Sequence, residues 1–170
     1  VELRSVPALV PLSSIARLSV LGRLPDSSYV AHGLMTDDAT RGMDVFRVSR
    51  QGEISVYQGG ARDQSLPSMS PDGKRLAYFT GALHPMQRAE LMVYDIPRDS
   101  VYRITNSDDK ETGFAWSSDG TRLAYVSSPA SRGTARVCWS TIDASSGACG
   151  SLPSDTIPKA VLGWRSDNEL

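Results

Sequence analysis

The sequence has 170 residues, of which 40% are hydrophobic and 22% charged, and these are ordinary values for one globular domain with a core of its own. Its 18 basic and 19 acidic residues give a net charge of −1, and no block of like charges occurs, so nucleic acid is not expected as a partner. No stretch approaches the roughly 18–20 consecutive apolar residues of a membrane-spanning helix, so this segment is not expected to insert into a membrane.

The first part of the chain, residues 1–17, has two prolines in its most apolar stretch. The chain begins with Val1 and lacks the basic, apolar and small-residue order of a signal peptide, so we expect a processed or excised piece of a longer protein. Residues 18–66 then hold a weak copy of a repeat. Leu-Pro-Asp-Ser-Ser-Tyr-Val-Ala at 24–31 leads into strands predicted at 29–33, 44–49 and 53–58.

The clearest copy of the repeat lies in residues 67–112. It opens with Pro-Ser-Met-Ser-Pro-Asp-Gly-Lys-Arg-Leu-Ala-Tyr, in which Asp72 and Gly73 form a tight-turn pair that favours a positive φ. Apolar and β-branched runs bounded by turn residues predict strands at 76–79, 91–96 and 101–105.

Residues 113–160 repeat this order, starting from Phe-Ala-Trp-Ser-Ser-Asp-Gly-Thr-Arg-Leu-Ala-Tyr. Strands are predicted at 122–127, 134–142 and 148–152. A further unit begins with Gly-Trp-Arg-Ser-Asp-Asn-Glu-Leu at the end of the chain. Successive copies are therefore spaced by 46, 47 and 48 residues, as measured between Asp26, Asp72, Asp119 and Asp167.

Four short strands in each unit of about 47 residues are typical of a β-propeller blade, because the strands of a sandwich lack self-similarity at this scale. No repeat holds a ten-residue stretch with helical apolar spacing, which argues against a helical solenoid. We therefore predict an all-β chain of three to three and a half blades, each of four antiparallel strands, that forms part of a larger propeller. The expected divisions are an N-terminal segment 1–17, a divergent blade 18–66, blades 67–112 and 113–160, and a truncated start of a fourth blade at 161–170.

The runs at 70–78, 91–96, 102–106 and 115–125 resemble the repeat of the TolB-type, WD-like β-propellers. The resemblance implies that the residue before each Ser-x-Asp-Gly turn lies on the innermost strand of its blade. It identifies a scaffold better than an activity, because motifs of a fold do not specify function. The motif residues are accordingly predicted to be structural: Ser70, Asp72, Gly73, Trp116, Ser117, Asp119, Gly120 and Trp164.

The predicted number of blades is too small to close a propeller, so the sheet edges at its two ends need partners. A closed propeller needs at least about four blades, and the resembled family usually closes its ring by pairing an N-terminal strand with the last blade. Residues 9–13 are the candidate closing strand, with partners expected beyond Leu170. Since an uncompleted sheet edge favours aggregation, the isolated chain is expected to form a homo-oligomer or to pair strands in trans.

The two cysteines flank a predicted hairpin turn at 143–147. Two strands joined by a tight turn bring facing Cβ atoms to about 4.5–5.5 Å, close to the separation that a disulfide needs. A bridge between Cys138 and Cys149 would indicate an oxidising compartment such as the periplasm. The alternative is a pair of unrelated buried thiols in a cytosolic protein.

No motif of a nucleophile elbow, a phosphate-binding loop or a zinc protease occurs, so no catalytic residue, cofactor or metal ligand is predicted. The loops at 35–43, 81–90 and 127–133 occupy equivalent places in three units and are expected to lie at one rim of the propeller. Their mixture of methionine, arginine and acidic residues suits protein contact, although simple exposed connections are the alternative. The candidate interaction rim consists of Arg41, His84, Met86, Arg88 and Arg132.

Two classes of function remain. The resemblance implies a non-catalytic protein-interaction or sensing module of the bacterial cell envelope, either the periplasmic sensory domain of a membrane-anchored transcription regulator or a TolB-like scaffold. The alternative is the substrate-gating propeller of a prolyl-oligopeptidase-like or tricorn-like serine peptidase, whose catalytic domain would lie outside this chain. In either case this chain by itself is not expected to be an enzyme.

Overall fold

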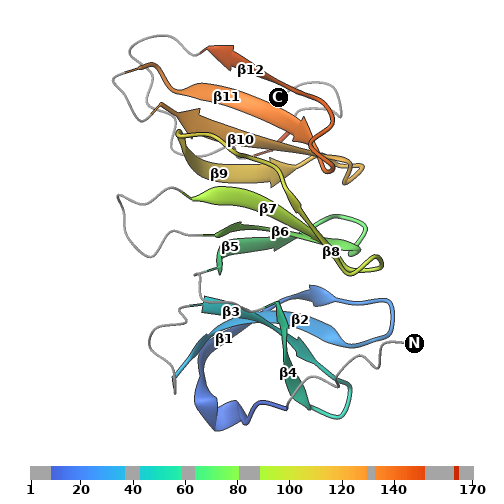
Figure 1. The fold of residues 1–170 in the computed structure, drawn as a ribbon. Coiled ribbons are helices and arrows are strands. Elements are labelled where there is room, and N and C mark those ends of the chain that lie inside the picture. Colours follow the sequence, from blue (N-terminus) through green and yellow to red (C-terminus); the bar gives the residue numbers. More distant parts are fainter. Residues whose placement is uncertain are drawn as a thin grey trace, which may run out of the picture. The chain divides into compact units, whose positions relative to one another are not determined.

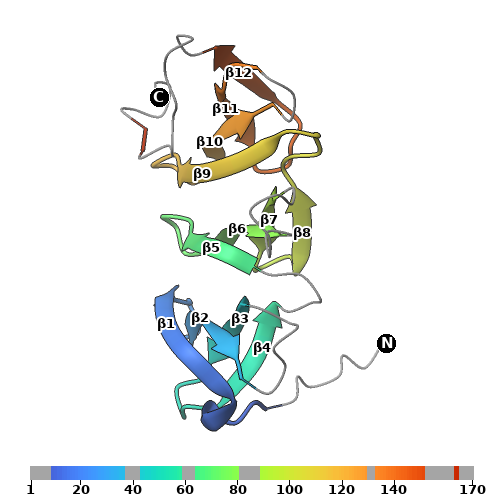
Figure 2. The same ribbon diagram turned by 90° about the vertical axis from the view of Figure 1, so that its left-hand side faces the viewer.

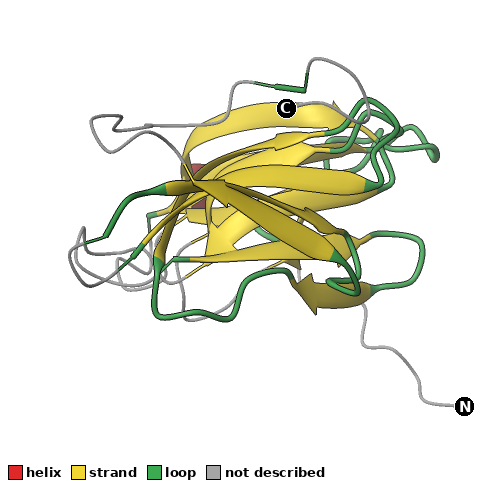
Figure 3. Cartoon of the chain, turned by 90° about the horizontal axis from the view of Figure 1, so that it is seen from above, coloured by secondary structure: helices red, strands yellow, loops and turns green. Residues whose placement is uncertain are grey.

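The computed structural model describes residues 9–36, 43–58, 64–80, 89–129, 133–151 and 163–164. Its regular structure is strand almost throughout, with one short 3-10 helix, η1 (Leu12–Ser14) (Figure 3). The strands form three four-stranded sheets (Figures 1 and 2), which confirms the prediction of an all-β chain built from four-stranded antiparallel units. The chain divides into two compact units, Val1–Gln64 and Ser65–Leu170.

The first unit contains the first sheet, whose strands follow the chain order β1-β2-β3-β4. Its core is a cluster of four buried residues, one from each strand: Ile15, Met35, Phe46 and Ile54. The strand bounds are β1 (Ile15–Arg23), β2 (Tyr29–Met35), β3 (Met43–Val48) and β4 (Ile54–Gln58).

The N-terminal segment lies beside the outer strand of this same sheet. Leu9 forms an isolated antiparallel bridge with Ser55 of β4, and the Val10 N–H donates to the Ile54 carbonyl at 2.7 Å. Within the described residues the segment thus extends the first sheet, and its pairing with a later blade stays a prediction.

The second unit contains two sheets, each again in chain order. The strands of the second sheet are β5 (Gln64–Met69), β6 (Arg75–Thr80), β7 (Glu90–Asp95) and β8 (Ser100–Arg103). Those of the third sheet are β9 (Lys110–Trp116), β10 (Arg122–Ser128), β11 (Arg136–Thr141) and β12 (Gly147–Ser151).

β8 ends two residues earlier than the sequence predicts. β8 stops at Arg103, whereas the apolar alternation suggested a strand through residue 105. The Thr105 hydroxyl accepts a hydrogen bond from the Leu91 N–H at 2.9 Å, and the Ile104 N–H donates to the Leu91 carbonyl at 2.8 Å. Side-chain bonding by a threonine therefore replaces the backbone ladder at this point, a competition that threonine favours.

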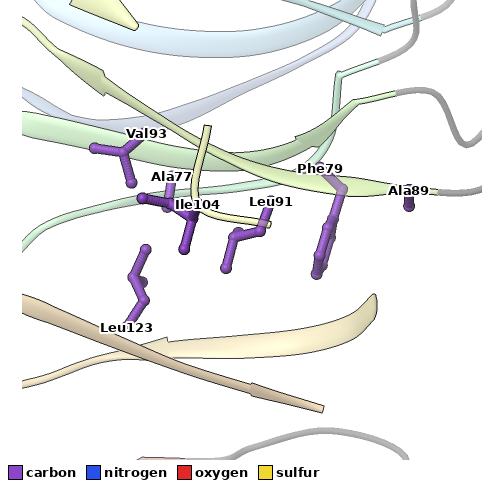
Figure 4. Close-up of a cluster of buried hydrophobic side chains, with 7 residues drawn as sticks. All are labelled: Ala77, Phe79, Ala89, Leu91, Val93, Ile104 and Leu123. Carbon is purple, nitrogen blue, oxygen red and sulfur yellow. The ribbon is translucent and has the colours of Figure 1, made fainter. Parts of the chain in front are cut away.

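The second and third sheets bury a common core (Figure 4). Every second residue of β6 and β7 faces it, as the period of two in a strand requires, and Leu123 enters it from β10. The rings of Phe79 and Phe114 meet edge to face with their centroids 5.4 Å apart. Each buried leucine or phenylalanine contributes about 1.5–3 kcal/mol of transfer free energy. The buried members are Ala77, Phe79, Ala89, Leu91, Val93, Ile104 and Leu123.

Candidate functional site

The Ser-x-Asp-Gly turn of the second sheet uses its polar groups within itself. The Ser70 hydroxyl donates to the Asp72 carboxylate at 2.6 Å, and the same carboxylate accepts the Lys74 N–H at 3.1 Å. The Arg75 N–H in turn donates to the Ser70 hydroxyl at 3.0 Å. Gly73 has φ 67, a left-handed conformation that glycine adopts without strain. The turn therefore reverses the chain with its own side chains as hydrogen-bond partners.

The turn of the third sheet repeats this network. Ser117 donates to Asp119 at 2.7 Å, the Thr121 N–H donates to Asp119 at 2.9 Å, and Gly120 also has φ 67. The hydrogen bonds from Ser117 and Thr121 lower the pKa of Asp119 to about 2, because they stabilise the charged form. In the first sheet the serine follows the aspartate instead, with the Ser28 hydroxyl donating to Asp26 at 2.6 Å.

Two tryptophans tie one repeat to the one before it. The Trp116 Nε1–H donates to the Ser68 carbonyl at 3.2 Å, and the Trp164 Nε1–H donates to the Ala115 carbonyl at 3.2 Å. Ser68 and Ala115 occupy the same place in successive repeats, just before the residue that precedes the turn. The two bonds thus form one repeating contact, in which each indole reaches back to the first strand of the previous sheet.

Arginines at one repeat position reinforce the same junctions. Arg75 donates to the Gly120 carbonyl of the third sheet at 3.3 Å and forms an ion pair with buried Asp95 at 3.4 Å. Its counterpart Arg122 has its guanidinium carbon 5.0 Å from the centroid of the Trp164 ring and 5.9 Å from that of Trp139. Cation–π contacts of this kind contribute about 0.5–2 kcal/mol.

The first strands carry a feature that the sequence did not reveal. Leu66 and Gly113 have φ values of 52 and 53 and stand at equivalent places in two repeats, each six residues before the turn aspartate. Arg17 of β1 also has a positive φ, 55, but lies nine residues before Asp26. The register of β1 shifts between Ala16 and Ser19, as at a β-bulge. Leu66 is 65% exposed, so a large apolar side chain is displayed from a conformation that L-residues avoid. Leucine and glycine occupy this place in the two repeats, so no repeated residue type marked the position.

A charged cluster also escaped the sequence analysis. Glu111 on β9 is 3% exposed, and its carboxylate accepts the Ser107 hydroxyl at 2.9 Å. Asp109 pairs with Arg136 of β11 and accepts the Ser127 hydroxyl at 3.0 Å. Burial raises the pKa of Glu111, and the carboxylates of Asp109 and Glu90 add to the rise, against the opposing Ser107 hydrogen bond. Ser107, Asp109 and Glu111 lie within five residues of one another, but Ser127 and Arg136 come from β10 and β11, so no short motif contains the whole cluster.

The cysteine pair lies on the last two strands of the third sheet. Cys138 of β11 and Cys149 of β12 stand directly opposite each other, and a disulfide joins them. The candidate interaction rim is a different matter, since all five of its residues, Arg41, His84, Met86, Arg88 and Arg132, lie outside the described residues.

The described residues hold neither a membrane-spanning helix nor a metal site. None of their helices has the length and apolar character needed to cross a membrane. Nor do three or more histidine, cysteine, aspartate or glutamate side chains among them gather in a group that could hold a metal ion.

Comparisons with known proteins identify the architecture. No protein-family model matches the chain, and no curated protein matches it. A putative TolB from Agrobacterium tumefaciens superposes with a TM-score of 0.57 at 19% identity, covering 79% of this chain and 49% of that one. TolB from Acinetobacter baumannii gives 0.52 at 17% identity, covering 76% and 31%. This chain therefore spans about half and about a third of the length of the two TolB structures.

Enzymes are among the similar structures as well. Puromycin hydrolase superposes with a TM-score of 0.56 at 18% identity, covering 85% of this chain and 24% of that one, and the tricorn protease gives 0.51. At these identities the likeness shows the fold alone. With its three four-stranded antiparallel sheets and their repeated turns, the chain has the fold of part of a TolB-like β-propeller.

Proposed function

We propose that this chain is part of a non-catalytic β-propeller that binds a protein partner in the bacterial cell envelope. The observation that carries the proposal is that the polar side chains of the repeated turn form hydrogen bonds within that turn. Ser70, Asp72, Ser117 and Asp119 all make hydrogen bonds within their own turns. Side chains used in this way build a scaffold and leave binding to residues outside the motif, as is common for loops on a rigid framework.

The proposed compartment rests on the cysteines and on the likeness to TolB. A disulfide persists in oxidising surroundings and is rare in the cytosol, where thiols are kept reduced. The Cys138–Cys149 bridge therefore supports an extracytoplasmic location. Within that compartment, we propose that the chain acts either as a TolB-like scaffold or as the periplasmic sensory domain of a transcription regulator.

Site-specific photo-crosslinking in living bacteria tests the binding role. A photoreactive amino acid replaces Met86 of the candidate interaction rim, and the matched control carries it at Val101 of β8, which is 43% exposed. We expect a crosslinked adduct of discrete mass from position 86 and none from position 101. Equal adducts at both positions, or none at 86 or at the other four rim positions, would contradict a partner-binding rim.

The second candidate is the propeller part of a peptidase, which the similarity to puromycin hydrolase and the tricorn protease favours. Mass spectrometry of the native protein distinguishes the two by identifying the peptides that flank Val1 and Leu170. A Gly-x-Ser-x-Gly segment in an adjoining hydrolase domain would support the peptidase. A winged-helix and a membrane-spanning segment would support the sensor. Turnover of peptide substrates by this chain alone would contradict both proposals.

A further inference from the structure

The disulfide is the only bond between β11 and β12 at its own rung of the ladder. Cys138 and Cys149 face each other with their Cα atoms 4.0 Å apart. At the hairpin end the Thr141 N–H donates to the Ser146 carbonyl at 2.8 Å. Hydrogen-bonded and non-hydrogen-bonded pairs alternate along an antiparallel ladder, and counting from Thr141 makes the cysteines a non-hydrogen-bonded pair. The two strands are joined there through sulfur alone.

The two halves of the disulfide differ in access. Cys138 is 1% exposed, and across the ladder it pairs with Tyr125, whose ring packs against the core of the unit. Cys149 is exposed, like every other residue of β12. β12 is also the outermost strand of the third sheet as described. A thiolate in solution therefore has open access to the Cys149 side of the bond and not to the Cys138 side.

We propose that Cys149 is a site of thiol–disulfide exchange with a protein dithiol. A thiolate of the partner attacks Cys149 Sγ, a new S–S bond forms as the Cys138–Cys149 bond breaks, and Cys138 leaves with the electron pair and takes a proton from water. The partner's second thiol then attacks the partner's own sulfur in the mixed disulfide. The partner ends as a disulfide and the chain as two thiols, with two electrons transferred. The same steps in reverse form the bridge.

Exchange would change how the outer strand is held while leaving the core in place. β12 contributes no buried side chain, whereas Leu123, Ala124 and Val126 of β10 are fully buried. After reduction only backbone pairing with β11 retains β12. We expect local release of this strand, because elements with few buried contacts open at low free energy. The inference rests on the cysteine pair and does not depend on the proposed binding role.

The test uses the oxidised protein and, as the probe, a thioredoxin whose second cysteine is replaced by serine, so that the mixed disulfide cannot resolve. The reaction is quenched with acid, free thiols are blocked with N-ethylmaleimide, and an Asp-specific protease cuts before Asp143, which separates the two cysteines. Because the exchange rate depends on access to the attacked sulfur, we expect about tenfold more probe on the Cys149 peptide than on the Cys138 peptide. Equal labelling of the two peptides, or an excess on the Cys138 peptide, would overturn the proposal. So would the absence of an adduct with the folded protein under conditions in which the unfolded protein does form one.

Two single-cysteine variants measure access independently of the probe protein. Cys138→Ser leaves the thiol of Cys149, and Cys149→Ser leaves that of Cys138. The first should react with Ellman's reagent about tenfold faster than the second, since thiol reactivity follows exposure; equal rates in folded variants would contradict the assignment. Hydrogen exchange follows the strand itself. Reduction should lower the protection of residues 147–151 and leave residues 122–127 unchanged, and a loss of protection in both would show that the release is not local.

Discussion

The indole bonds between repeats lead to a measurable loss of stability when one donor is removed. Trp116→Phe keeps an aromatic ring against the core of the second unit and deletes only the N–H that donates to the Ser68 carbonyl at 3.2 Å. A neutral hydrogen bond of this kind contributes about 0.5–1.5 kcal/mol net. The smaller ring adds the loss of part of its buried surface. We expect a total loss of about 1–2 kcal/mol in the free energy of unfolding.

The assay is urea unfolding followed by circular dichroism, which does not depend on the tryptophan that is removed. A loss of 1 kcal/mol lowers the melting temperature of a domain of this size by about 2–4 °C, so thermal unfolding provides a second reading. The matched control is Trp139→Phe, the same substitution on β11, which keeps an aromatic ring beside the Arg122 guanidinium. If Trp116→Phe destabilises the protein no more than Trp139→Phe, the indole bond does not hold the two sheets together.

Three further predictions concern the bulge, the buried carboxyl and the turn. Gly113→Ala should cost about 1–2 kcal/mol in urea unfolding because an L-residue is strained at φ 53. Gly150→Ala, where an added Cβ meets no atom within 4 Å, should cost much less, and equal costs would refute the reasoning. Glu111 has a raised pKa in the folded state, so its contribution to stability is complete below the ordinary value of 4.5 and is lost as the pH rises through the folded value. Glu111→Gln should therefore remove part of the fall in unfolding free energy between pH 4.5 and 7.5, and an unchanged slope would contradict the burial effect. NMR titration of the Asp119 carboxyl should give a pKa of about 2, moving toward the usual value in Ser117→Ala; no movement would exclude the Ser117 hydrogen bond as the cause.

The sequence predicted those parts of the molecule in which the same chemistry recurs at the same spacing. An Asp-Gly pair specifies a tight turn wherever it occurs, and a strand of alternating apolar residues must bury one face, so the sheets and turns followed from the repeat. The direction in which each tryptophan reaches could not be predicted, because the acceptor is a backbone carbonyl and carries no residue identity. The sequence therefore predicts a structural role for Trp116 and Trp164 without indicating their partners.

The features that escaped prediction are those in which the copies differ or distant residues meet. The left-handed position six residues before the turn aspartate holds leucine in one repeat and glycine in the next, so no residue type reveals it. The cluster around Glu111 joins residues of β9 and β11 that are 25 positions apart between Glu111 and Arg136. Only the pairing of strands brings them together, and a single sequence does not specify that pairing.

These differences between copies also bear on function. Turns and indole bonds recur from repeat to repeat, and the fold they build is shared by TolB structures and by structures named as hydrolases, so they do not distinguish one role from another. The left-handed position shared by β5 and β9 behaves differently, because it displays an exposed isobutyl group at Leu66 and no side chain at Gly113. Strain in a backbone persists where the surrounding structure compensates for it, and such positions gather at functional sites. If the first strands take part in recognition, this variation at one repeated position gives the second and third sheets different contact chemistry.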